Sequence, residues 1–131
     1  MKMNKKGFTL IELLAVIVIL AIIALIATPI ILGVIDNARK NSARDAAFGV
    51  IDAVRLQYIE QMYSANTTVS YAGSVDNLSL SGTKPESGQW KIVDDGSVQI
   101  SNVKFGEYKC RSIGDGDVEC SRTDQDYTTG N

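Results

Sequence analysis

Residues 5–14 read Lys-Lys-Gly-Phe-Thr-Leu-Ile-Glu-Leu-Leu, and this stretch opens the longest apolar run of the chain. From Leu13 to Ile35 no residue is charged, so Glu12 is a single carboxylate at the head of 23 uncharged residues. As a helix, that run is about 35 Å long, which is enough to cross a hydrocarbon layer of about 30 Å. The sequence therefore predicts a membrane-spanning helix that begins beside an acid.

A secretory signal peptide also combines a basic start with an apolar core, but that core is usually only about 7–15 residues long. No Ala-x-Ala cleavage site closes the run in this chain. The basic residues before the run are Lys2, Lys5 and Lys6, whereas those after it, such as Arg39 and Lys40, are interleaved with aspartates. The positive-inside tendency therefore places the amino end in the cytoplasm and the rest of the chain outside, as a single-pass protein.

The helical pattern continues beyond the membrane boundary. No proline occurs between Asp36 and Tyr63, and apolar residues recur there at every third or fourth position, which is typical of an amphipathic helix. One helix over about residues 8–63 is predicted, apolar all round in 8–35 and amphipathic in 36–63. Pro29 has no amide hydrogen, so a kink is predicted near it. The apolar stripe comprises Ala43, Ala47, Val50, Val54, Tyr58 and Met62, widened by Phe48, Ile51 and Ile59.

The remaining residues predict a small antiparallel sheet. Residues 64–89 are rich in turn-forming residues and are expected to form a connecting loop with room for one short strand. In residues 90–122 a first hairpin is expected around Asp94–Gly96 and a second from Lys104 to Ser121. About four strands would present Trp90, Ile92, Val98, Ile100 and Tyr108 to Val50, Val54 and Tyr58 of the helix stripe, which gives an α+β fold. Residues 123–131 form a polar tail, apart from any packing by Tyr127.

Cys110 and Cys120, the only two cysteines, lie symmetrically about Asp115. A turn centred on that residue would place the two thiols opposite one another, with Tyr108 and Val118 on the same face. An even pair of cysteines beyond an export segment more often indicates a disulfide than a metal site or a nucleophile. A disulfide that links the two strands of the last hairpin is therefore predicted.

Composition argues against several functions. The chain has no histidine, so it lacks the usual general base and metal ligand, and no phosphate loop or nucleophile elbow is present. We therefore expect no enzyme and no cofactor. The formal charge is −2 for the whole chain and −5 from Phe8 onward, which offers no clear nucleic-acid surface. One metal alternative stays open, a calcium site formed by Asp94, Asp95, Asp115, Asp117 and Glu119, although aspartates beside glycine more often form turns.

The arrangement Lys-Gly-Phe-Thr-Leu-Ile-Glu before an apolar run resembles the processing signal of type IV pilins and of the pseudopilins of type II secretion and competence systems. The resemblance covers roughly residues 4–60, with Gly7, Phe8, Glu12 and Pro29 at the family's positions, whereas the sheet resembles the family only in plan. It implies the pilin fold, a leader peptide over residues 1–7, cleavage by a prepilin peptidase between Gly7 and Phe8, and N-methylation of Phe8.

The resemblance also implies how copies of the chain assemble. Glu12 would pair with the Phe8 amine of a neighbouring subunit, and residues 8–35 would form the filament core. The alternative for Glu12 is that it stabilises the amino end of its own helix through the helix dipole. The implied partners are copies of the chain, the cytoplasmic membrane and the pilus assembly platform, and the implied product is an extracellular filament.

Three candidate functions are compatible with these features. A major pilin is favoured over a pseudopilin by the complete motif and by an exported part of ordinary pilin size. The third candidate is a binding protein held by an uncleaved membrane anchor.

Overall fold

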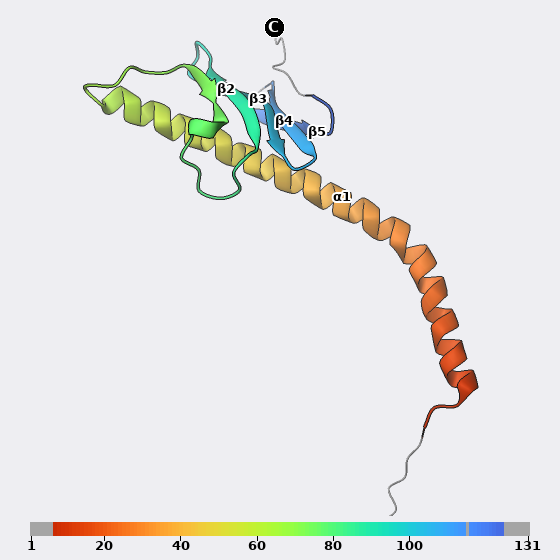
Figure 1. Cartoon of the computed structure of the whole chain (residues 1–131). Helices are drawn as coiled ribbons and strands as arrows, with labels where there is room; N and C mark the ends of the chain where they lie inside the picture. Colours follow the sequence, from red (N-terminus) through yellow and green to blue (C-terminus); the bar gives the residue numbers. More distant parts are fainter. Residues whose placement is uncertain (1–6, 115, 125–131) are drawn as a thin grey trace, which may run out of the picture. The chain divides into compact units, whose positions relative to one another are not determined.

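The computed structural model describes residues 7–114 and 116–124. One helix, α1 (Leu10–Tyr63), precedes five strands: β1 (Ala72–Ser74), β2 (Ser87–Ile92), β3 (Val98–Phe105), β4 (Tyr108–Ile113) and β5 (Asp117–Ser121). A short 3-10 turn, Val75–Asn77, follows β1. The chain divides into an amino-terminal unit that ends at Asn37 and a second unit that begins at Ala38, which contains the sheet (Figure 1). The predicted α+β fold, a long helix followed by a small antiparallel sheet, is confirmed.

In the amino-terminal unit, α1 is apolar on every side. Its large side chains from Leu10 to Ile35 are between 41% and 86% exposed, so nothing in the described chain covers them. The helix is continuous through Pro29, which removes the amide that would bond the Leu25 carbonyl. Beside it, the Thr28 hydroxyl donates to the Ala24 carbonyl at 2.6 Å. The predicted kink at Pro29 stays a prediction.

In the second unit, α1 packs on the sheet through the predicted stripe. Ala43, Ala47, Val50 and Val54 are buried. They share one core with residues of the sheet, among them Trp90, Val98, Ile100, Val103 and Tyr108. Val75 and Leu78 from the connecting segment complete this core.

The stripe does not stay buried to the end of the helix. Ile51, which was expected to widen it, is buried, and Tyr58 is half-buried with its ring 5.9 Å from that of Tyr71. Met62 and Ile59 are 60% and 44% exposed. The sheet therefore covers the stripe at Val50 and Val54, as expected, whereas the last turn of α1 stays exposed.

The sheet is antiparallel throughout, with the strands in chain order. The first predicted hairpin is confirmed, because Trp90 faces Ile100 and Ile92 faces Val98 across β2 and β3. The second was placed too early. Residues 106 and 107 form a separate turn between β3 and β4, so Lys104 belongs to β3 and the last hairpin begins at Tyr108. The sheet therefore has five strands instead of about four, and β2 starts at Ser87, inside the predicted loop.

A bulge lies between β2 and β3, where the pairing shifts between Ser87 and Gln89. Gly88 has a φ of +145°, and a Cβ there would lie 2.7 Å from the Val103 Cα. Opposite it, Asn102 has a φ of 48°, a left-handed conformation that asparagine tolerates better than most residues. The bulge lets both Ile100 and Val103 point into the core, although simple alternation would place them on opposite faces.

The last hairpin has the predicted register. Cys110 faces Cys120 and forms a disulfide with it. Tyr108 and Val118 are buried on the same face. The turn residue Asp115 and the predicted packing of Tyr127 lie outside the described residues, as does most of the polar tail.

Candidate assembly site

The amino end of α1 is fixed by a reciprocal pair of hydrogen bonds. The Thr9 amide donates to Glu12 Oε2 at 3.1 Å, and the Glu12 amide donates to Thr9 Oγ1 at 3.3 Å. This is a capping box, in which a threonine and a glutamate three residues later satisfy two amides that the helix leaves free. The helix was predicted to begin near Phe8, and the cap at Thr9 explains why α1 begins at Leu10 instead.

The capping box also settles where the Glu12 side chain lies in the isolated chain. Its carboxylate folds back on its own helix end, which is close to the alternative that the sequence left open. The Thr-x-x-Glu spacing is visible in the sequence and was missed, because Glu12 was considered only for its charge. The bond occupies Oε2, and no other residue between 7 and 114 or between 116 and 124 forms a hydrogen bond with Oε1.

The two residues at the predicted cleavage point are open to solvent. Gly7 is exposed, and no atom lies within 4 Å of the position that a Cβ would take. Phe8 is 82% exposed. Residues 1–6, which include the three lysines of the predicted leader, lie outside the described residues. Cleavage and methylation at this point stay predictions.

The helix that follows can cross a membrane. Of the described elements, α1 is long and apolar enough to span one, and its most apolar window has no residue buried inside the structure. An apolar rod with every side exposed needs either lipid or other apolar helices around it. Membrane storage of the chain fits this feature.

The described carboxylates of the possible calcium cluster do not gather around one point. Among the described residues, no group of three or more acidic, histidine or cysteine side chains is placed to hold a metal ion. Asp95 accepts a hydrogen bond from the Ser97 hydroxyl, which lowers the pKa of that carboxyl, and the Ser97 amide lowers it further. Asp117 pairs with Arg44, and Glu119 pairs with Arg111 at 3.0 Å. Asp115 lies outside the described residues.

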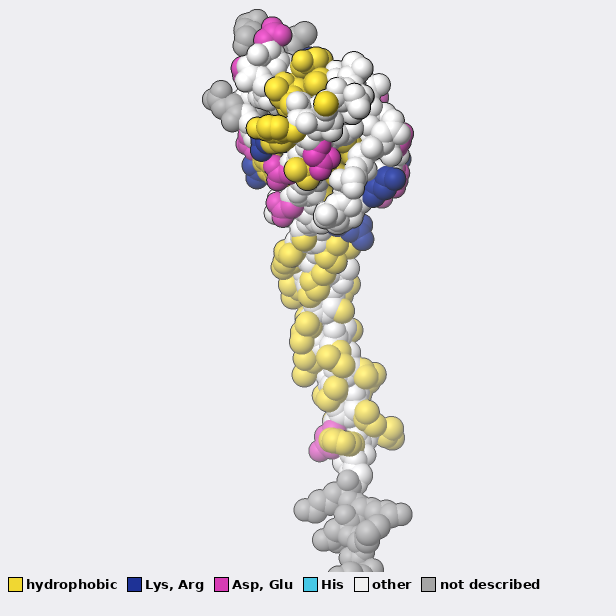
Figure 2. All heavy atoms as spheres, turned by 90° about the vertical axis from the view of Figure 1, so that its left-hand side faces the viewer, with side chains coloured by type: hydrophobic (Ala, Val, Ile, Leu, Met, Phe, Trp, Pro, Cys, Tyr) yellow, Lys and Arg dark blue, Asp and Glu magenta, His cyan; other side chains and the backbone are white. Residues whose placement is uncertain are grey.

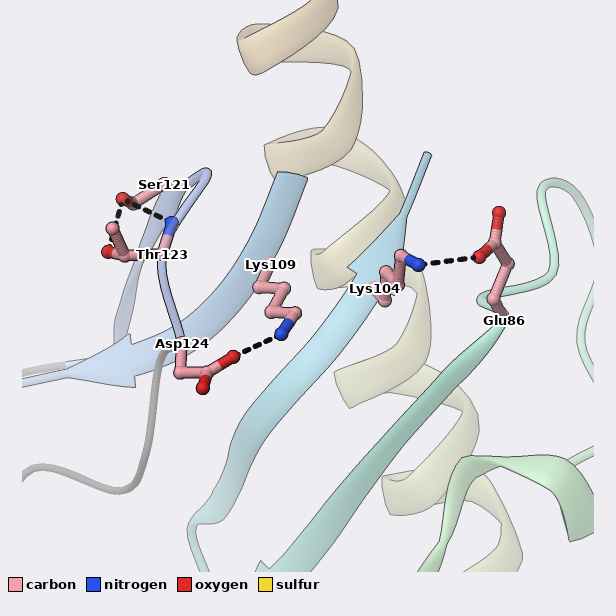
Figure 3. Close-up of polar contacts among 6 residues, drawn as sticks. All are labelled: Glu86, Lys104, Lys109, Ser121, Thr123 and Asp124. Carbon is pink, nitrogen blue, oxygen red and sulfur yellow. Dashed lines mark hydrogen bonds and ion pairs between the residues drawn. The ribbon is translucent and has the colours of Figure 1, made fainter. Parts of the chain in front are cut away.

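Ion pairs neutralise the outer face of the sheet. Lys104 pairs with Glu86 at 3.3 Å, and Lys109 pairs with Asp124, as Figure 3 shows. Next to the second pair, the hydroxyls of Ser121 and Thr123 lie 2.9 Å apart. Cations that already hold carboxylates do not form a phosphate-binding surface, so this face gives no support to nucleic-acid binding.

Comparison with known proteins identifies the family of the chain. Residues 2–28 match the family model of the prokaryotic N-terminal methylation motif. The chain is similar to a protein of Clostridium perfringens (strain 13 / Type A), "Prepilin peptidase-dependent protein A", with 33% identity over 95 residues. The match covers 71% of this chain and 68% of the relative. No solved structure matches. The methylation motif, the long apolar helix with its small disulfide-linked sheet, and this relative together show that the chain belongs to the type IV pilin and pseudopilin family.

Proposed function

We propose that this chain is the major pilin of an extracellular type IV pilus, a structural subunit stored in the cytoplasmic membrane after leader removal. The observation that carries the proposal is the position of Glu12 at the head of a rod whose large apolar side chains are all exposed. Such a rod can leave lipid only if other apolar rods surround it. Copies of the same chain supply them.

Glu12 gives the bundle its register. Charged groups inside an apolar medium cost several kcal/mol unless they are paired. Cleavage after Gly7 would create a positive amine on Phe8, and methylation would leave that charge in place. The capping bond uses only Oε2 of Glu12, so Oε1 can accept the amine of a second copy while the helix cap stays formed. Four residues separate Phe8 from Glu12, about 6 Å along a helix, and this offset would set the stagger between neighbours.

Substitutions at the capping box distinguish the proposed role of Glu12 between subunits from its role in capping its own helix. Glu12→Gln keeps a side chain that can form the box but removes the charge, whereas Thr9→Ala removes the cap and keeps the charge. We expect Glu12→Gln to insert and be processed normally but to yield few filaments. Thr9→Ala should cost only about 1 kcal/mol of helix stability and should still assemble. Sheared surface filaments, quantified against the membrane pool of subunit, give the measurement.

The opposite pattern, with Glu12→Gln assembling and Thr9→Ala failing, would show that Glu12 only caps its own helix. Mass spectrometry of purified subunits tests processing independently. We expect a chain that starts at Phe8 and carries a methyl group on its amine. A chain that retains the leader would instead support the anchored binding protein. A processed chain that stays in the membrane and forms no surface filament would support the pseudopilin.

A further inference from the structure

The last turns of α1 carry an exposed apolar patch that the core does not use. Leu56, Ile59 and Tyr63 are 58%, 44% and 89% exposed. Their spacings of three and four residues place them together on one side of the helix, with Glu60 among them. We call these four residues the end patch. Figure 2 views the second unit from this end and shows apolar side chains close to acidic ones.

A matching hollow lies nearer the start of the second unit. A cavity of about 310 Å3 opens between α1 and the turn that joins β3 to β4. Its apolar lining includes Ala43, Ala46, Phe105 and Tyr108. On the helix side, the lining is made by the small side chains of Ala43 and Ala46. Arg39 stands among the lining residues, so the cavity combines apolar walls with a cation. We call this the alanine pocket.

The charges of the two features are complementary. Neither Arg39 nor Glu60 forms an ion pair within residues 7–114 and 116–124. The carboxylate in the pocket lining, that of Glu107, is 3.6 Å from the Arg122 guanidinium. The patch therefore offers an unpaired anion and the pocket an unpaired cation, which favours contact between them and opposes contact of either feature with itself.

The two features cannot meet within one copy. Both are carried by the same helix, in which Tyr63 lies 17 positions, about 26 Å, beyond Ala46. A patch that fits a hollow elsewhere on the same molecule makes a head-to-tail contact, and such contacts produce open chains of copies. We propose that the end patch of one subunit enters the alanine pocket of the next, with Tyr63 in the hollow and Glu60 beside Arg39. This inference rests on the proposed filament function and deepens it by naming a second interface.

Charge reversal tests the contact in the full-length protein. Arg39→Glu and Glu60→Arg should each reduce sheared filaments about tenfold, because each places like charges together at a desolvated contact. The double variant restores opposite charges and should assemble nearly as the wild type does. Lys40→Glu is the matched control, because Lys40 is an exposed cation next to Arg39 that does not line the pocket, and it should change little. The membrane pool of oxidised subunit confirms that each variant folds.

Crosslinking tests the same contact without removing any member of it. Ser42 lines the pocket and Ser64 follows the end patch, and both are exposed. The native cysteines are joined and buried, so thiols introduced by Ser42→Cys and Ser64→Cys are the ones that a bismaleimide reaches. Filaments carrying both substitutions should give a ladder of dimers, trimers and longer products, and each single substitution should give none.

The outcomes separate this inference from the proposed function. Filaments that form but give no ladder, together with a double charge variant no better than the single ones, would overturn the contact and leave the pilin assignment standing. A wild-type chain that is processed but never forms filaments would overturn both.

Discussion

Removal of the Cys110–Cys120 disulfide tests how the small sheet is held together. The bond joins residues separated by 10 positions, and the chain-entropy relation for so short a loop gives about 2.7 kcal/mol at 25 °C. Replacement of both cysteines by alanine also removes two sulfur atoms from sites that are 0% and 3% exposed, so a packing cost is added. We expect a total loss of about 3–4 kcal/mol. A domain of ordinary stability survives this loss but unfolds at a clearly lower denaturant concentration.

Trp90 makes the measurement direct. It is the only tryptophan, it is 5% exposed, and its indole nitrogen donates to the Ser74 carbonyl at 3.3 Å. Its fluorescence can follow guanidinium unfolding of the full chain in detergent. Reduced wild-type protein is the control, because it loses the crosslink but keeps both sulfur atoms. If reduction changes the free energy of unfolding by less than about 1 kcal/mol, loop closure does not stabilise this hairpin and the reasoning is wrong.

Two further predictions use the same assay. Gly88→Ala should lower the free energy of unfolding by at least about 2 kcal/mol, because the new Cβ would lie 2.7 Å from the Val103 Cα and residue 88 has a φ of +145°. The matched control is Gly49→Ala, on an exposed helix face where no atom lies within 4 Å of the new Cβ. This control should raise the free energy of unfolding by about 1 kcal/mol. The Arg44 side chain, and then the Val118 amide, hold the pKa of Asp117 below its ordinary value of 3.8. This contribution to stability is complete above that value and is lost as the pH falls through the lower folded pKa, so Asp117→Asn should flatten the acid side of the stability profile, and an unchanged profile would contradict the assignment.

Much of the fold was predictable because the sequence specifies it redundantly. A proline-free apolar stripe predicted the second half of α1, and burial of Val50 and Val54 confirms it. The spacing of Cys110 and Cys120 predicted the register of the last hairpin, since a shift of one residue would have sent the two thiols to opposite faces. At the amino end, the glycine, aromatic and glutamate positions identified the family, which the comparisons confirm.

The missed features have weak local signals. Residues 106 and 107 lack the Asn-Gly or Asp-Gly pair that usually marks a two-residue hairpin. The end of β3, from Lys104, was therefore assigned to the second hairpin. β1 consists of three small residues, Ala72–Ser74, and is a strand only because β2 lies beside it. The alanine pocket depends on which residues of separate elements meet, and neither helical period nor strand alternation reports that.

The exposed apolar half of α1 has a consequence for how assembly is controlled. Transfer of each large aliphatic side chain from lipid to water would cost about 1.5–3 kcal/mol of free energy. Such side chains line the helix from Leu10 to Ile35. The population of free subunits in water is therefore negligible, and in the proposed assembly every copy must pass directly from the bilayer to the filament. The supply of subunits is a two-dimensional population, so growth should respond to the number of copies per area of membrane and to their lateral diffusion, and not to any concentration in the surrounding solution.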